Sequence, residues 1–65
     1  MFSYDEFERL CNERKVTPYR VATDTGISTA TLSEWKNGAY VPKYNKIAAI
    51  AKYFNVPIET FLKKE

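Results

Sequence analysis

Apolar residues recur along the chain at the spacing of amphipathic helices, with polar residues between them. Phe7, Leu10 and Cys11 follow the i, i+3, i+4 spacing of one helical face, and Ile47 and Ile50 repeat it further along. The pattern predicts an all-α fold class, a compact bundle of five helices. We expect these at residues 4–15, 18–25, 29–37 and 44–54, followed by a short helix starting at Pro57 whose Ile58, Phe61 and Leu62 close the core.

Capping residues stand at three of the predicted helix starts. Ser3 and Glu6 have the spacing of a capping box, in which each side chain accepts a hydrogen bond from the other residue's backbone N–H. Thr17 precedes Pro18, which suits the first helical position because no N–H is needed there. Ser28 is the expected N-cap of the helix at 29–37.

The second and third helices are joined very tightly. Gly26 ends the second helix because glycine adopts positive φ without strain, and Asn37 with Gly38 ends the third. Two short helices joined by a few residues that include glycine form a helix-turn-helix. The sequence therefore predicts this motif over residues 17–37, followed by a loop over 38–43.

The third helix has an apolar side and a side of mostly small residues. At about 100° per residue, Leu32 and Trp35 face inward, with Thr31 beside them. The outward side carries Thr29, Ala30, Ser33, Glu34, Lys36 and Asn37. Small side chains allow close approach to base edges, and threonine or alanine methyls can contact a thymine methyl. An ordinary exposed helix would look similar, but the tight turn before it favours insertion into a major groove.

Composition excludes several classes of protein. A chain of 65 residues with one cysteine and no histidine has room for one domain, and it can form neither an internal disulfide nor a histidine-containing zinc site. We expect no metal, no cofactor, no small-molecule substrate and no enzymatic activity, because paired carboxylates and a phosphate-binding glycine loop are also missing. The absence of a long apolar run and of a signal peptide, together with a lone thiol, predicts a cytoplasmic protein without a membrane partner.

Charge is unevenly distributed along the chain. Residues 1–13 carry a net charge of −3, residues 14–52 carry +5, and residues 53–65 are balanced. A basic central segment suits a polyanionic partner such as DNA. A mildly basic solvated surface is the alternative interpretation of the same charges.

The stretch from Thr17 to Gly38 resembles the helix-turn-helix of the Cro/CI-type (XRE-like) phage repressors. Its marks are Ala22, Gly26, Ile27, Leu32 and Gly38, and the similarity continues through Pro42 and residues 47–62. The resemblance implies a domain of the lambda-repressor-like type that binds double-stranded operator DNA. Relatives commonly bind as a homodimer on a two-fold symmetric site, so a homodimer is a possible partner here.

Functional positions follow from that resemblance and from the predicted surface. The expected base-reading residues are Thr29, Ala30, Ser33 and Glu34. The expected phosphate-binding residues are Thr17, Tyr19, Ser28, Lys36, Asn37, Tyr40, Lys43, Tyr44 and Lys46. Two alternatives stay open at this point. Tyr40 and Tyr44 either clamp a phosphate or pack over the loop, and Lys36 meets either a phosphate or Glu13.

The sequence departs from the family pattern at several places. Pro18 stands where many relatives have glutamine, and the reading helix has neither glutamine nor arginine at its first two positions. Glu34 either accepts a hydrogen bond from a cytosine amino group or repels non-specific DNA. Where many relatives pair an arginine with a glutamate, this chain has Cys11 and Lys36, so we expect Cys11 and Trp35 to fill that region as core.

A second function is compatible with the same fold. The weakly equipped reading helix and Glu34 suggest a protein-interaction module that has lost DNA reading, and an exposed apolar patch around Phe54, Val56 and Phe61 would serve its partner. A related alternative is an antitoxin, which would bind both DNA and a toxin. The leading hypothesis from the sequence is a sequence-specific transcriptional regulator, of the phage repressor kind.

Overall fold

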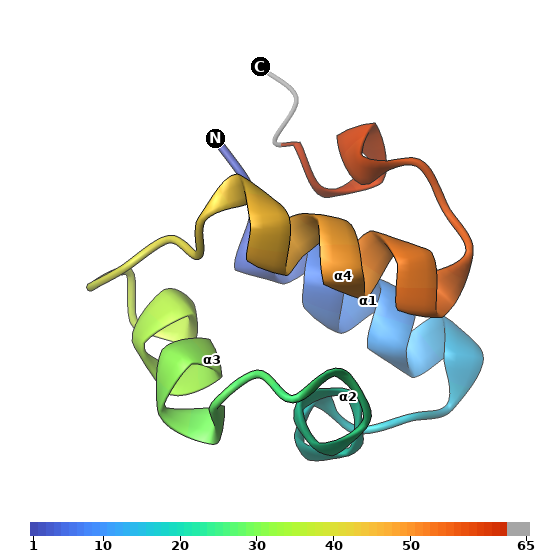
Figure 1. Cartoon of the computed structure of the whole chain (residues 1–65), viewed down its shortest axis with the longest axis horizontal. Coiled ribbons are helices and arrows are strands. Elements are labelled where there is room, and N and C mark those ends of the chain that lie inside the picture. The colour runs from blue at the N-terminus through green and yellow to red at the C-terminus, as the bar shows by residue number, and fades with distance from the viewer. Residues whose placement is uncertain (63–65) are drawn as a thin grey trace.

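The computed structural model describes residues 1–62 and is helical throughout its regular elements. The elements are α1 (Tyr4–Arg14), α2 (Pro18–Thr25), α3 (Thr29–Lys36), α4 (Tyr44–Phe54) and the 3-10 helix η1 (Ile58–Phe61). In Figure 1, α4 lies in front of α1, α2 is seen end-on below them, and α3 lies at one end. The predicted all-α class is confirmed. None of these helices has the length and apolar character needed to cross a membrane.

The predicted fifth helix is one 3-10 turn rather than an α-helix. It contains four residues and directly follows Pro57, whose carbonyl accepts a hydrogen bond from the Thr60 N–H at 3.0 Å. A segment this short closes i to i+3 bonds more readily than a ladder of α-helical bonds. The fold of residues 1–62 is therefore four α-helices and a closing turn.

Side-chain caps fix both helices of the helix-turn-helix. The Thr17 Oγ1 accepts a hydrogen bond from the Arg20 N–H at 3.1 Å, and the Ser28 Oγ accepts one from the Ala30 N–H at 3.1 Å. Gly26 ends α2 with a φ of 78°. These three predictions are confirmed, and they leave only residues 26–28 between α2 and α3.

The capping box predicted for Ser3 and Glu6 is wrong. Ser3 is the N-cap residue of α1, but its side chain makes no capping hydrogen bond. Its backbone N–H donates to the Phe61 carbonyl at 2.7 Å, so the donor that Glu6 would have satisfied is already bonded. The Glu6 carboxylate instead accepts from the Arg9 guanidinium, with Oε1 at 2.9 Å from Nη2.

Leu62 does not close the core as predicted. Phe61 is fully buried and Ile58 is half-buried, but Leu62 is 39% exposed. The chain is extended at Leu62, which forms an antiparallel bridge with Phe2. Leu62 therefore lies outside the 3-10 helix and pairs its backbone with the N-terminal segment, while Phe61, the last residue of that helix, stays in the core.

An aromatic cluster joins α1 to α3 and α4. The Phe7 ring centroid lies 5.3 Å from that of Trp35 and 6.4 Å from that of Phe54. The Tyr4 ring meets Trp35 edge-on at 5.4 Å. The predicted core roles of Trp35 and Cys11 are confirmed, since both are buried. Burial raises the pKa of the Cys11 thiol to about 11, so the thiol stays protonated and unreactive near neutral pH.

The apolar patch predicted for a protein partner is not exposed. Phe54 and Phe61 belong to the core, and Val56 is half-buried against it. Phe54 lies in the last turn of α4, and its ring contacts Phe7 of α1. The residues assigned to a partner surface therefore hold the domain together.

Trp35 should contribute strongly to stability through both packing and a hydrogen bond. Its indole N–H donates to the Phe2 carbonyl at 3.2 Å. Trp35→Phe removes this bond and part of the buried area, so the free energy of unfolding should fall by about 1–3 kcal/mol in urea titrations. The control Tyr19→Phe alters an exposed ring and should change it by less than about 0.5 kcal/mol. Equal effects of the two substitutions would contradict this account of Trp35.

Candidate nucleic-acid interface

The outward face of α3 is open to solvent. Leu32 and Trp35 anchor the opposite face, with exposed fractions of 4% and 3%. The four predicted base-reading residues are all exposed: Thr29, Ala30, Ser33 and Glu34. Three of these four side chains are small. The helix therefore presents a low ridge that would fit against base edges.

The chain after α3 is folded back onto the end of the helix. The Glu34 carbonyl accepts hydrogen bonds from the N–H groups of Ala39 and Tyr40, at 2.9 and 3.3 Å. Gly38 has a φ of 78°, a left-handed conformation that favours glycine. Asn37 is exposed at the C-cap of α3, where its N–H donates to the Ser33 carbonyl. These bonds fix the start of the loop beside the exposed face of α3.

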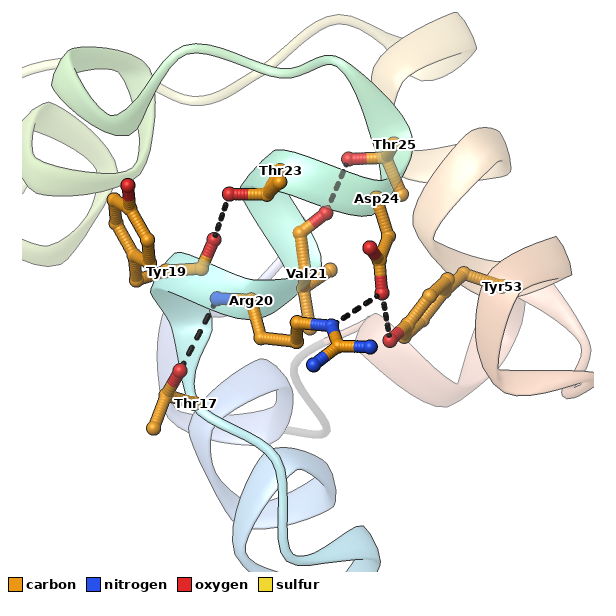
Figure 2. Close-up of polar contacts among 8 residues, drawn as sticks. All are labelled: Thr17, Tyr19, Arg20, Val21, Thr23, Asp24, Thr25 and Tyr53. Atoms are coloured by element: carbon orange, nitrogen blue, oxygen red, sulfur yellow. Dashed lines mark hydrogen bonds and ion pairs between the residues drawn. The ribbon is translucent and has the colours of Figure 1, made fainter.

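The N-termini of α2 and α3 each carry a capping hydroxyl group, and the first turn of α2 also carries an exposed ring. Tyr19 is 71% exposed, and Figure 2 shows its ring pointing away from the polar contacts at the other end of α2. The oxygens of Thr17 and Ser28 already accept backbone hydrogen bonds, which leaves each hydroxyl proton available for a phosphate. By contrast, the Thr23 and Thr25 hydroxyls donate to carbonyls of their own helix.

The start of α4 is the third part of the candidate interface. Lys43, Tyr44 and Lys46 are all exposed, and Tyr44 is 65% exposed although its ring lies 6.4 Å from that of Phe2. Tyr40 is exposed in the preceding loop, so the structure leaves both tyrosines accessible to a phosphate. Asn45 is exposed in the same first turn of α4 and is a further candidate at this surface. Its position between Tyr44 and Lys46 was the signal that could have identified it.

Lys36 does not pair with Glu13. The Glu13 carboxylate is bonded to the Arg9 guanidinium of its own helix. Within residues 1–62, Lys36 forms no ion pair and is exposed at the end of α3. The Glu13 alternative for Lys36 is therefore wrong, and the phosphate contact stays a prediction.

A family model described as a Cro/C1-type HTH DNA-binding domain matches residues 6–65. The chain belongs to this family. Comparisons with curated proteins and with solved structures give no match. Membership confirms the resemblance seen in the helix-turn-helix. The Cro/C1-type domain is thus a DNA-binding unit in which α3, exposed on its outward face, follows the tight turn at residues 26–28.

A polar network ties α2 of this Cro/C1-type domain to α4. The Asp24 Oδ2 accepts hydrogen bonds from the Tyr53 hydroxyl at 2.7 Å and from the Arg20 Nε at 3.0 Å (Figure 2). These two donors, that of Tyr53 first, lower the pKa of the Asp24 carboxyl. The i, i+4 spacing of Arg20 and Asp24 was a signal for their ion pair. Nothing in the sequence indicated Tyr53, because it joins the pair only through the packing of α4 against α2.

The Asp24 network should stabilise the Cro/C1-type domain near neutral pH and lose its effect in acid. A carboxyl whose pKa is lowered by folding adds stability above its ordinary pKa of 3.8 and loses it as the pH falls through the folded value. Tyr53→Phe removes the main donor, so it should lower the free energy of unfolding more at pH 7 than at pH 2.5. Urea titrations at both pH values measure this difference.

Tyr40→Phe is the matched control for the network. Tyr40 has an exposed fraction of 40% against 37% for Tyr53, and within residues 1–62 its hydroxyl makes no hydrogen bond. Its removal should leave stability nearly unchanged at both pH values. A loss in Tyr53→Phe that is the same at pH 7 and pH 2.5 would argue against an ionised Asp24 as the acceptor.

Proposed function

We propose that this protein is a sequence-specific transcriptional regulator, of the phage repressor kind, which inserts α3 into the major groove of an operator. The observation that carries the proposal is the exposed ridge of small side chains on α3, backed by buried Leu32 and Trp35. In a helix-turn-helix the second helix lies in the groove while the first crosses the backbone. Membership of the DNA-binding family supports the same function. Such a regulator acts in the cytoplasm, where we place this protein.

Three groups of residues around α3 are suited to bind phosphates. Thr17, Tyr19 and Ser28 lie at the N-termini of α2 and α3, where backbone N–H groups and the helix dipole favour an anion. Lys36, Asn37 and Tyr40 follow along the end of α3 and the loop, and Lys43, Tyr44 and Lys46 begin α4. These contacts would fix the register of α3 on the duplex, while Thr29, Ala30, Ser33 and Glu34 read the bases.

A role as a protein-interaction module or an antitoxin has less support. Of the apolar patch that was expected to serve a partner, Phe54 and Phe61 are part of the core and Val56 is half-buried against it. A homodimer on a two-fold operator stays part of the regulator proposal. Selection of bound sequences from a random DNA pool tests this, because a symmetric dimer selects inverted half-sites about 10 base pairs apart, or multiples of that.

Binding to DNA should be strong at low salt and should weaken steeply as salt rises. Each neutralised phosphate releases counterions, so the logarithm of the affinity falls by about 0.9 per phosphate per tenfold rise in salt. Fluorescence anisotropy with a labelled duplex from the selected pool measures this slope. Absence of DNA binding at low salt, with a circular dichroism spectrum showing a folded helical protein, would falsify the proposal.

Substitutions in the two kinds of contact should have different signatures. Lys43→Ala and Lys46→Ala should weaken all sequences together and reduce the salt slope by about 1 each. Thr29→Val and Ser33→Ala should change the base preference and leave the slope as it is, because they remove hydroxyls without removing charge. Anisotropy titrations against selected and scrambled duplexes distinguish the two outcomes.

Lys52→Ala is the control for the lysine substitutions. Lys52 is exposed on the same helix, α4, but in its last turn, away from Lys43 and Lys46. Its removal should leave the affinity and the slope nearly unchanged. If Lys52→Ala matched Lys43→Ala, or if Lys43→Ala altered base preference alone, the division of roles given above would be wrong.

A further inference from the structure

Glu34 is an acidic residue on the face that would meet a polyanion, and within residues 1–62 its carboxylate has no hydrogen-bond or ion-pair partner. The carboxylates of Glu6, Glu13 and Asp24 are each bonded to an arginine of their own helix. Within residues 1–62, the Glu34 side chain is exposed and makes neither a hydrogen bond nor an ion pair. Asp5, Glu8 and Glu59 are also unpaired there, but they lie on α1 and η1.

The backbone at Glu34 is held in place on both sides. Its carbonyl accepts two hydrogen bonds from the loop, from Ala39 and Tyr40, and the next residue is the buried Trp35. The side chain of Glu34 therefore extends from a backbone position that is fixed on the outward face of α3. An anion held there is repelled by phosphates and loses hydration in a groove, unless a base donates a hydrogen bond to it.

The bases differ in what they offer a carboxylate in the major groove. Guanine presents two acceptors and thymine presents an acceptor and a methyl group, so both leave the carboxylate without a donor. Adenine presents an amino donor beside the N7 acceptor, which faces a carboxylate lone pair to lone pair. Cytosine presents its 4-amino donor with no acceptor of its own beside it, and glutamate commonly accepts from this group.

We propose that the operator carries a cytosine whose 4-amino group donates to the Glu34 carboxylate, and that this contact selects the base at that position. The inference rests on the proposed function, since it assigns a base to one residue of the same reading face. It makes Glu34 a specificity-determining residue rather than a group that only weakens non-specific binding.

Substitution of Glu34 by glutamine should switch the selected base. A glutamine amide both donates and accepts, and this pairs with the N7 and amino group of adenine. Pools selected by the unmodified protein should retain cytosine at one position of the site, and pools selected by Glu34→Gln should retain adenine at the same position. In titrations, Glu34→Gln should lose on the order of tenfold affinity for the cytosine site relative to the adenine site.

Two further variants distinguish loss of the cytosine contact from the general effect of removing a negative charge. Glu34→Ala should lose the cytosine preference without gaining one for adenine. Glu59→Gln removes the same charge from η1, which packs on α1 and α4, and it should retain cytosine. Because the Glu34 side chain is exposed and makes no ion pair or hydrogen bond within residues 1–62, thermal unfolding should be nearly the same for Glu34→Gln and the unmodified protein.

A base analogue tests the hydrogen bond directly. A duplex in which 2-pyrimidinone replaces the selected cytosine lacks only the 4-amino group. The unmodified protein should bind this duplex on the order of tenfold more weakly than the cytosine duplex, while Glu34→Ala should bind both equally. This comparison cancels any effect of the analogue on the duplex itself.

The outcomes distinguish this inference from the function on which it rests. If the folded protein binds no DNA at low salt, both fall. If it selects a defined site, but Glu34→Gln raises the affinity for every sequence equally and keeps the same base, the regulator stands and the cytosine contact is overturned. Retention of cytosine by Glu34→Ala would overturn it as well.

Discussion

The contact between Trp35 and Phe7 is the interaction on which the candidate interface depends. An eight-residue helix is too short to be stable alone in water, so α3 exists because its inner face is packed. Trp35 contributes to that packing with its ring, whose centroid lies 5.3 Å from that of Phe7, and its indole N–H donates to the Phe2 carbonyl. The helix is thus fixed to α1 and to the N-terminal segment, and its small outward residues are left free.

Each capping hydroxyl of the helix-turn-helix uses its oxygen within the fold and keeps its proton for another contact. Thr17 and Ser28 satisfy helical N–H groups with their oxygens, while their protons stay unused by those bonds. A residue that stabilises a helix start can therefore also donate to a phosphate at that place. Structure and binding need not compete for these side chains, because the two roles use different atoms of one hydroxyl group.

Arginines and lysines have separate tasks in residues 1–62. All three arginines are engaged internally: Arg9 with Glu6 and Glu13, Arg20 with Asp24, and Arg14 with the Phe54 carbonyl at 3.0 Å. The Arg14 contact places a cation at the C-terminus of α4, where the helix dipole favours it. No lysine within the same residues forms an ion pair. A planar guanidinium suits fixed contacts, and a hydrated ammonium on a flexible stem suits an exposed surface that meets phosphates.

The sequence by itself determined the four α-helices, the caps of α2 and α3, the tight turn and the side of α3 that faces out. These features depend on residues three or four apart, so local spacing, glycine at a positive φ and hydroxyl caps were enough to predict them. Tertiary structure alone decided the contacts between distant segments. The Ser3 N–H donates to the Phe61 carbonyl in place of Glu6, Leu62 pairs with Phe2 and stays exposed, and Tyr53 bonds to Asp24, 29 residues away in the sequence. Such pairings depend on which chain segments meet in space, and no spacing along the sequence records that.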